Sequence, residues 1–339
     1  TQLIMRHEAL RTSFTFSDRD LVQKIHNQVD WNLETVAVSE SELDQVINKH
    51  IKLFNLNQAP LARVVLFTVS DQRDVLFIDL HHIISDGVSF DILVKDFMYL
   101  YEGGKLPDLD IQYKDFTIWQ EEFKKTPQME KQMLYWQGVL KENIPELKLP
   151  LDYERSKSRS FEGNTIQFNI SSNIVRKLTE LAKETNVTLN TLLFGAYTLL
   201  LNKYTEQRDI VIGTVVSGRT HVQTDNIIGA FVNLLPIRNV INPNDKIESF
   251  IQECNDVLLN AYENQDYHYT SMIEECGIKI DRTRNPIFDT ALLFHNEYDS
   301  NTKLKVSNVP FSVKALPTNQ SQLDIKLDIF ISELNELNC

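Results

Sequence analysis

The stretch that decides the fold is ARVVLFTVSDQRDVLFIDLHHIISDG, residues 62–87. Two runs within it, Ala62–Val69 and Asp74–Leu80, are rich in Val, Leu, Ile and Phe, which is the composition of buried strands. The polar residues 70–73 between them predict a turn, so the two strands should form a hairpin. The second strand leads directly into two adjacent histidines. The sequence therefore predicts a β-hairpin that ends at a pair of imidazoles.

Periodic segments on both sides of the hairpin alternate between helix and strand, which predicts an α/β or α+β fold. A helix is expected over Ser41–Phe54, because its apolar residues recur on one helical face. Beyond the hairpin we expect a strand at Thr165–Ile170, a helix capped by Ser171 or Ser172 with Ile174, Leu178, Leu181 and Ala182 inward, a buried helix at Thr188–Tyr204, a strand at Asp209–Val216 and a late strand at Asp324–Ile331.

The motif His81-His82-Ile83-Ile84-Ser85-Asp86-Gly87 is the sharpest local feature of the sequence. Side chains alternate along a strand, so His81 and His82 should point to opposite faces, one to the core and the other to a cleft. Asp86 lies past a turn and is placed to hold the loop in shape. Gly87 leaves room for a ligand chain to pass close to the backbone.

Other interpretations of the two histidines were weighed. A single histidine at a strand end is more often a structural residue than a catalytic one. A metal site is disfavoured, because adjacent histidines rarely chelate one ion together and no third ligand stands at a recognisable spacing. A serine hydrolase is disfavoured as well, since the chain has no Gly-x-Ser-x-Gly elbow.

Composition and charge exclude several classes of protein. The chain has 339 residues, of which 42% are hydrophobic and 24% charged, as in ordinary folded proteins. The net charge of −13 argues against nucleic-acid binding, which needs clustered Lys and Arg. No apolar run is long enough to cross a bilayer, so no membrane partner is expected. Cys254, Cys276 and Cys339 show no paired spacing, which indicates reduced thiols and a cytoplasmic location.

The chain is long enough for two lobes, each with its own core. From Pro145 to Gly163 the sequence loses its periodicity and gains prolines, charges and serines. We therefore expect an N-terminal lobe over 1–150, which carries the two histidines, an interlobe linker over 151–163 and a C-terminal lobe over 164–339.

Six segments together resemble the condensation domains of nonribosomal peptide synthetases, which are related to chloramphenicol acetyltransferase. The histidine motif resembles their HHxxxDG signature. All six segments stand in the order of the family. Before the histidine motif, Arg6–Thr12 resembles RHExLRT. After it, Tyr113–Trp119 resembles Y-x-D-[FY]-x-x-W, Ile228–Asn233 resembles IGxFVN, Asn264–Tyr267 resembles the next motif, and Arg284–Phe288 resembles RNPxF.

The resemblance implies two acetyltransferase-like lobes that form a pseudo-dimer around a central tunnel. It implies amide bond formation between a donor acyl or peptidyl thioester and an acceptor aminoacyl thioester. Both substrates would arrive on the phosphopantetheine arms of upstream and downstream peptidyl carrier proteins, with an adenylation domain in the same assembly line. The domain itself would bind no cofactor. Both ends of the family domain are expected to be missing.

The resemblance also assigns roles to residues. His82 is the expected catalytic group, acting on the acceptor amine as a base or by positioning it, with His81, Asp86 and Gly87 in the same motif. Asp86 is expected to pair with Arg6 or Arg11 and thereby to hold the loop. The candidates for the substrate tunnel or the lobe junction are Gly229, Asn233, Arg284 and Asn285. No metal is expected.

Two alternative functions remain open at this point. One is an acyltransferase that uses coenzyme A, and the other is a non-catalytic relative that only recruits partners. The paired histidines argue against heterocyclising relatives, which have an aspartate pattern instead. The Arg284–Phe288 segment argues against epimerising relatives. Condensation is therefore the favoured function.

Overall fold

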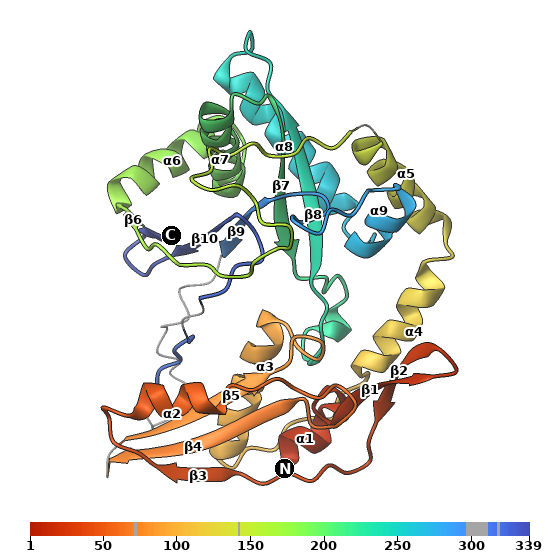
Figure 1. Cartoon of the computed structure of the whole chain (residues 1–339), viewed down its shortest axis with the longest axis vertical. Coiled ribbons are helices and arrows are strands. Elements are labelled where there is room, and N and C mark those ends of the chain that lie inside the picture. The colour runs from red at the N-terminus through yellow and green to blue at the C-terminus, as the bar shows by residue number, and fades with distance from the viewer. Residues whose placement is uncertain (71–72, 142, 296–310, 317–318) are drawn as a thin grey trace. The chain divides into compact units, whose positions relative to one another are not determined.

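The computed structural model describes residues 1–70, 73–141, 143–295, 311–316 and 319–339, and it divides into two compact units (Figure 1). Unit 1 contains Thr1–Phe123 together with Arg219–Val232. Unit 2 contains Lys124–Gly218 and most of the described residues from Asn233 onward. The segment 219–232 therefore leaves unit 2 between two strands, packs in unit 1 and returns.

Unit 1 is built around a three-stranded sheet with the order β3-β4-β5. Strand β3 (Glu34–Ala37) runs parallel to β4 (Ala62–Ser70), which pairs antiparallel with β5 (Arg73–Leu80). The predicted hairpin is thus confirmed. A separate antiparallel pair is formed by β1 (Thr12–Ser17) and β2 (Asp20–Ile25).

Two helices of unit 1 cover opposite faces of this sheet. Successive strand residues point to alternate sides, so each face has apolar side chains against which one helix packs. Helix α2 (Leu43–His50) packs on the face that carries Val65, Phe67 and Phe77. Helix α3 (Gly87–Tyr101) packs with Leu61 and with residues of the other face, including Ile78. The remaining short helices are α1 (Gln2–Arg6), η1 (Glu8–Arg11), α4 (Tyr113–Phe123) and η2 (Val222–Thr224).

Unit 2 contains a mixed sheet with the order β6-β11-β10-β9-β7-β8. Its centre is parallel, with β10 (Ile325–Ile331) beside β9 (Thr290–His295) and β9 beside β7 (Asp209–Val216). Strand β8 (Asn233–Val240) closes one side antiparallel to β7. At the other side β11 (Leu337–Asn338) joins β10 to β6 (Asn169–Ile170), again antiparallel. The predicted strand at 209–216 is confirmed, and β10 confirms the late strand.

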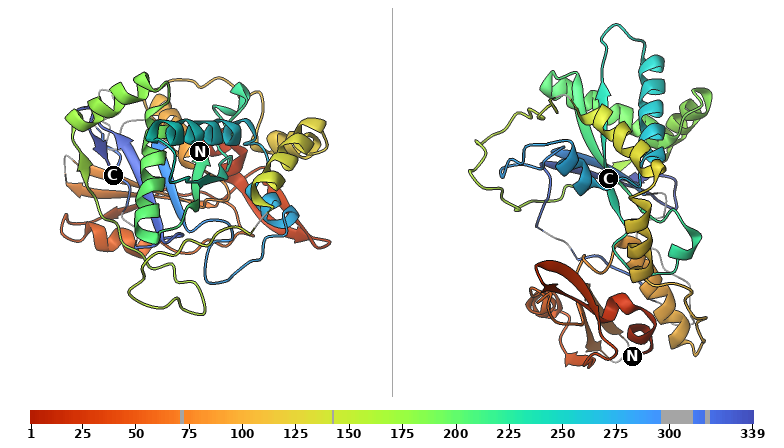
Figure 2. Two further views of the ribbon diagram at one scale, coloured as in Figure 1. Left: turned by 90° about the horizontal axis from the view of Figure 1, so that it is seen from above. Right: turned by 90° about the vertical axis from the view of Figure 1, so that its right-hand side faces the viewer.

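Helices α7 (Leu189–Thr205) and α8 (Ile247–Glu263) pack side by side against β7 and β8 (Figures 1 and 2). Thr188 caps α7 by accepting a hydrogen bond from the Thr191 N–H, and Leu193, Phe194, Tyr197 and Leu201 are among its buried residues. The buried helix predicted for this region is confirmed. The other helices of unit 2 are α5 (Pro127–Leu140), α6 (Ser172–Glu184) and α9 (Tyr269–Glu275).

Three predicted elements differ from those found. Helix α2 ends at His50 rather than at residue 54, and the strand expected over 165–170 is reduced to Asn169–Ile170. Helix α6 begins where it was predicted, after Ser171, but its inward face is different. Val175 and Ala182 are buried, whereas Ile174 and Leu181 are largely exposed. Residues seven apart lie on one face, so the buried stripe of α6 is narrower than its apolar content suggested.

The division into units differs from the predicted boundary at residues 150/151. Helix α5 belongs to unit 2, because the Trp136 indole N–H donates to the Asn264 carbonyl at 2.7 Å and is fully buried there. The predicted linker, 151–163, lies within unit 2, and the Gly163 N–H donates to the Asn319 carbonyl. A polar, aperiodic composition therefore identified a loop, but the packing of the preceding helix decided to which unit it belongs.

Both units are mixed α/β structures, which agrees with the predicted fold class. None of the helices in the described part of the chain has the length and apolar character that a bilayer crossing requires.

Candidate active site

The two histidines lie in a tight turn that follows the β4–β5 hairpin, and not in strand β5 itself. Strand β5 ends at Leu80, and His81 and His82 follow it. The His81 N–H donates to the Leu61 carbonyl at 3.0 Å, and the His81 carbonyl accepts from the Ile84 N–H at 3.0 Å. Strand alternation was therefore the wrong reason for separating the two imidazoles, although their surroundings do differ.

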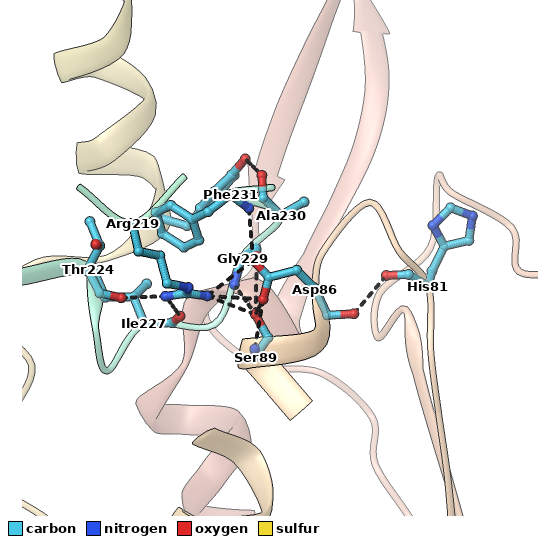
Figure 3. Close-up of polar contacts among 11 residues, drawn as sticks. His81, Asp86, Ser89, Arg219, Thr224, Ile227, Gly229, Ala230 and Phe231 are labelled. Atoms are coloured by element: carbon cyan, nitrogen blue, oxygen red, sulfur yellow. Dashed lines mark hydrogen bonds and ion pairs between the residues drawn. The ribbon is translucent and has the colours of Figure 1, made fainter. Parts of the chain in front are cut away.

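The His81 side chain is half-buried and has a structural role in the turn. Its Nδ1 accepts a hydrogen bond from the Ile83 N–H at 3.0 Å, so the proton of the neutral ring lies on Nε2. The ring meets Phe54 edge-on, with centroids 6.0 Å apart. Figure 3 shows His81 on the side of the loop away from Arg219.

The His82 side chain is exposed and lines a hollow of about 360 Å³. Gly87 and Phe90 at the start of α3 line the same hollow, as do Ile78 and Leu80 of β5. Within the described ranges, the His82 imidazole has no hydrogen-bond partner. A hydrogen atom at the Gly87 Cα could be replaced by a methyl group without meeting any heavy atom within 4 Å. The space in front of His82 is therefore open to a substrate.

Asp86, in contrast, is completely buried and saturated with hydrogen bonds (Figure 3). It is the N-cap of α3, and its Oδ1 accepts from the N–H and the hydroxyl of Ser89, both at 2.7 Å. Its Oδ2 accepts from the Phe231 N–H at 3.1 Å. The Arg219 Nη2 donates to Oδ1 at 3.1 Å. The carboxylate thus ties the histidine loop, α3 and the segment 219–232 together.

Arg219 is the cation that compensates this buried carboxylate, and its side chain is only 4% exposed. Its Nη1 donates to the carbonyl oxygens of Thr224 and Ile227, the latter at 2.8 Å. The guanidinium lies over the ring of Phe231, 4.1 Å from its centroid. The Nη2 group donates to both oxygens of Asp86, at 3.1 and 3.4 Å, and such extensive hydrogen bonding is what allows an ion pair to be buried at low cost.

The predicted partners of Asp86 were Arg6 and Arg11, and that prediction is wrong. The Arg6 Nε donates to Asp96 Oδ2 at 2.9 Å, where the buried His7 also binds through Nε2 at 3.0 Å. Arg11 donates to the His26 carbonyl at 2.7 Å and pairs with Glu8. Both arginines are mostly buried, and each pairs with a carboxylate other than Asp86. The family resemblance had pointed to the N-terminal arginines, whereas the partner found lies 133 residues after Asp86.

The acidic partner of Arg6 is perturbed by this arrangement. Burial opposes the ionisation of Asp96, but the hydrogen bonds and charges of His7 and Arg6 outweigh it and hold its pKa below the ordinary value of 3.8. Arg6 and Asp96 line a second hollow of about 590 Å³, which has no histidine among its lining residues. This larger space therefore lacks the acid–base group that marks the hollow at His82.

Gly229, a predicted tunnel residue, is buried against Tyr113. A Cβ at this position would lie 2.1 Å from the Tyr113 ring, so only glycine fits. Both backbone groups of Gly229 bond to the Ser89 hydroxyl, at 2.8 Å for the carbonyl and 3.1 Å for the N–H. Burial raises the pKa of Tyr113, and the charge of Asp86 raises it further. Gly229 thus lies at the back of the histidine loop.

The three other tunnel candidates lie in unit 2, each within a local network. The Asn233 Nδ2 donates to the carbonyls of Gln265 and Tyr267, at 2.8 and 3.0 Å. Arg284 pairs with Asp289 at 2.7 Å, and Asn285 accepts from the Tyr269 hydroxyl at 2.6 Å. Arg284 and Asn285 also line a hollow of about 330 Å³ in unit 2.

Sequence reasoning missed Arg219, Ser89 and Phe231 as members of the site. Arg219 was visible only as the residue that follows the strand 209–216. Ser89 carried a weak signal, because a hydrogen-bonding residue three positions after an aspartate N-cap is a common capping pattern. Among the described residues, no group of three or more His, Cys, Asp or Glu side chains is placed to hold a metal ion.

The geometry defines a class of site. An exposed imidazole stands in an open hollow, on a loop held from behind by a buried carboxylate and its arginine. An imidazole titrates near neutrality and can accept and return a proton, which is the requirement of acyl transfer to a nucleophile. The arrangement has the features that acyl transfer by an imidazole would require.

Comparison with known proteins specifies the class further. The family model described as Condensation domain matches residues 1–339. Gramicidin S synthase 2 from Aneurinibacillus migulanus is 39% identical over 327 residues, which are 96% of this chain and 7% of that protein. Bacitracin synthase 1 from Bacillus licheniformis is 40% identical over 294 residues, 87% of this chain and 6% of that protein. The chain belongs to the condensation domain family of nonribosomal peptide synthetases.

Solved structures show the same fold. The X-domain from teicoplanin biosynthesis has a TM-score of 0.87 at 21% identity, covering 99% of this chain and 78% of that one. A four-domain nonribosomal peptide synthetase bound to AMP and glycine gives a TM-score of 0.87 at 21% identity, covering 99% of this chain and 27% of that one. At these identities the likeness concerns the fold alone. The chain spans a small part of the length of the curated relatives that it matches.

Proposed function

We propose that this domain joins two carrier-bound substrates by aminolysis of a thioester. The donor is an acyl or peptidyl thioester and the acceptor an aminoacyl thioester, each on the phosphopantetheine arm of a peptidyl carrier protein. The carrier proteins and an adenylation domain belong to the same assembly line, which works in the cytoplasm. Phosphopantetheine enters as part of the substrates, so the domain needs no resident cofactor.

The observation that carries this proposal is the contrast between His82 and the residues around it. His82 lines the open hollow, and no described group occupies its imidazole nitrogens. Asp86, four residues after His82, is buried and fully bonded. The turn is therefore held in place while its reactive side chain stays available, which is the arrangement that catalytic positioning requires.

The reaction balances with one imidazole as proton carrier. The acceptor nitrogen attacks the donor carbonyl carbon, a C–N bond forms, and the C–S bond of the donor thioester breaks. The proton lost by the amine goes to His82 and is returned to the leaving thiolate, so the products are an amide and a free thiol on the donor arm. Holding both tethered reactants at one place supplies further rate acceleration.

The two-lobe tunnel also belongs to the proposal. In it, the hollow at His82 is the reaction chamber, and Asn233, Arg284 and Asn285 shape the parts of unit 2 that substrates pass. Gly229 is assigned to support of the histidine loop, because its neighbours are Tyr113 and Ser89.

The decisive experiment measures amide formation between two loaded carrier proteins by the full-length protein that carries this chain. His82→Ala should lower the rate by about 10²–10⁴-fold, the usual contribution of a general base, while folding as the parent does. His50→Ala is the matched control, because His50 lies on α2 and bonds to the Val46 carbonyl, outside the hollow. It should leave the rate unchanged.

Other outcomes of the same assay discriminate between functions. If His82→Ala keeps its rate within a few-fold of the parent, proximity alone drives the reaction and the base assignment is wrong. Acylation from free acyl-coenzyme A, with no product from carrier-bound donors, would show a coenzyme A-dependent acyltransferase instead. Binding of both carriers without any product from the intact protein would show a non-catalytic recruiting domain.

A further inference from the structure

The hollow at His82 has an aromatic wall that the reaction itself does not require. Phe90 lies three residues after Gly87 on α3, and residues three apart share a helical face. Both residues line the hollow together with His82. The first turn of α3 thus presents a bare backbone position at Gly87 and a large apolar ring beside it.

Phe90 differs from Phe97, another aromatic residue of the same helix. It is only half-buried, and among the described residues its ring contacts no other aromatic ring. Phe97, two turns further along α3, packs its ring against Tyr101 with centroids 5.9 Å apart. Burial of an aromatic side chain is among the largest apolar contributions that a residue makes. Phe90 leaves part of that surface facing the hollow.

The position of His82 determines which part of a substrate meets this surface. A base must lie within hydrogen-bond distance of the acceptor amine, at about 2.6–3.2 Å. The acceptor side chain is attached to the carbon next to that nitrogen, so it enters the same hollow. A space of about 360 Å³ is at the small end of the usual range of ligand sites, and it can hold an amino acid side chain beside its walls.

We propose that Phe90, with Ile78 and Leu80 at the edge of β5, forms the wall against which an apolar acceptor side chain packs. Phe90 is then a residue that determines specificity for the acceptor, and the substrate class is an aminoacyl thioester with a medium-sized apolar side chain. This inference rests on the proposed condensation activity. It adds to that activity a preference that His82 and Asp86 do not confer.

The test compares leucyl and alanyl carrier proteins as acceptors, with one fixed donor, in the full-length protein. The parent should prefer the leucyl acceptor in kcat/KM. Phe90→Ala should reduce the leucyl-to-alanyl ratio by about 10-fold, because apolar contacts of this size discriminate by 10–200-fold. Phe97→Ala is the matched control on the same helix and should leave the ratio unchanged. Phe90→Leu, which keeps an apolar wall, should retain most of the preference.

Three results would overturn the proposal. The ratio could stay unchanged in a folded Phe90→Ala protein, or Phe97→Ala could shift it equally. The third is a Phe90→Ala protein that responds to the donor side chain rather than to the acceptor. Each of these leaves condensation activity intact and so is distinct from failure of the proposed function, in which the parent forms no amide from any acceptor.

Discussion

The two faces of the histidine loop have opposite characters. On the rear face, Asp86 and Ser89 form a buried network with Arg219 and the backbone of Gly229, in which every carboxylate oxygen is bonded. On the front face, His82 and Gly87 border open space. The loop is therefore held through the bonds of Asp86 and Ser89 on its rear face, while the His82 side chain on its front face stays accessible.

The largest effect on the contrast between the two faces is expected from removal of the Asp86 carboxylate, which holds the rear face together. Asp86→Ala removes the partner of a buried arginine and leaves Arg219 as an uncompensated charge, which costs about 3–5 kcal/mol. Stability to urea should fall by that amount, and activity should fall with it. Asp110→Ala, an exposed aspartate of unit 1, is the control and should unfold as the parent does. An Asp86→Ala protein of parental stability would show that the network does not hold the loop.

The two glycines of the site provide a sharper comparison. Gly229→Ala places a methyl group against the Tyr113 ring, and such overpacking costs about 1–3 kcal/mol. Gly87→Ala meets nothing within 4 Å, so it should leave stability unchanged or slightly raised, since alanine is the better helix former. Thermal melting of both variants checks this. Equal destabilisation by the two substitutions would contradict the distinction between a packed rear face and an open front face.

A substitution of Ser89 measures how much its hydroxyl contributes to the hydrogen-bond network of the rear face. Its hydroxyl has one proton and two lone pairs, yet four partners lie within reach: Asp86, Arg219, and the N–H and carbonyl of Gly229. Ser89→Ala leaves the backbone groups of Gly229 without this partner, at a cost of about 1–3 kcal/mol. Ser39→Ala, on the surface, should have no effect on the same urea titration. A neutral Ser89→Ala substitution would show that water replaces the hydroxyl.

The smallest expected effect concerns acid stability at the Arg6 cluster. The pKa of Asp96 is held below 3.8 in the folded protein, so the folded state binds fewer protons there than the unfolded state. The stabilisation by Asp96 is therefore fully present at pH values above 3.8, the ordinary pKa, and is lost as the pH falls through the lowered pKa of the folded state. Asp96→Asn should reduce the difference in melting temperature between neutral pH and a pH below 3.8. An unchanged difference would show that Asp96 does not contribute to acid unfolding.

The pattern of apolar and turn residues over neighbouring positions predicted much of the secondary structure. The β4–β5 hairpin, α7 and β7 were predicted from runs of apolar residues and turn residues, because these preferences act over neighbouring positions. The same pattern overextended α2 and the strand before α6. Helix α2 ends before the apolar residues Ile51 and Phe54, and only Asn169–Ile170 of the predicted strand pair in the sheet, so the apolar pattern alone did not place these ends.

The sequence by itself determined the family and the motif His81–Gly87, and it predicted His82 as the catalytic group, which stays a prediction. Only the tertiary structure decided that Asp86 pairs with Arg219 rather than with Arg6 or Arg11, that Gly229 supports the loop through Ser89, and that α5 belongs to unit 2. The physical reason is that a buried charge selects its partner by proximity in three dimensions and by desolvation. Residues 86 and 219 are brought together only when the segment 219–232 packs in unit 1. Periodicity along the chain carries no information about this long-range packing.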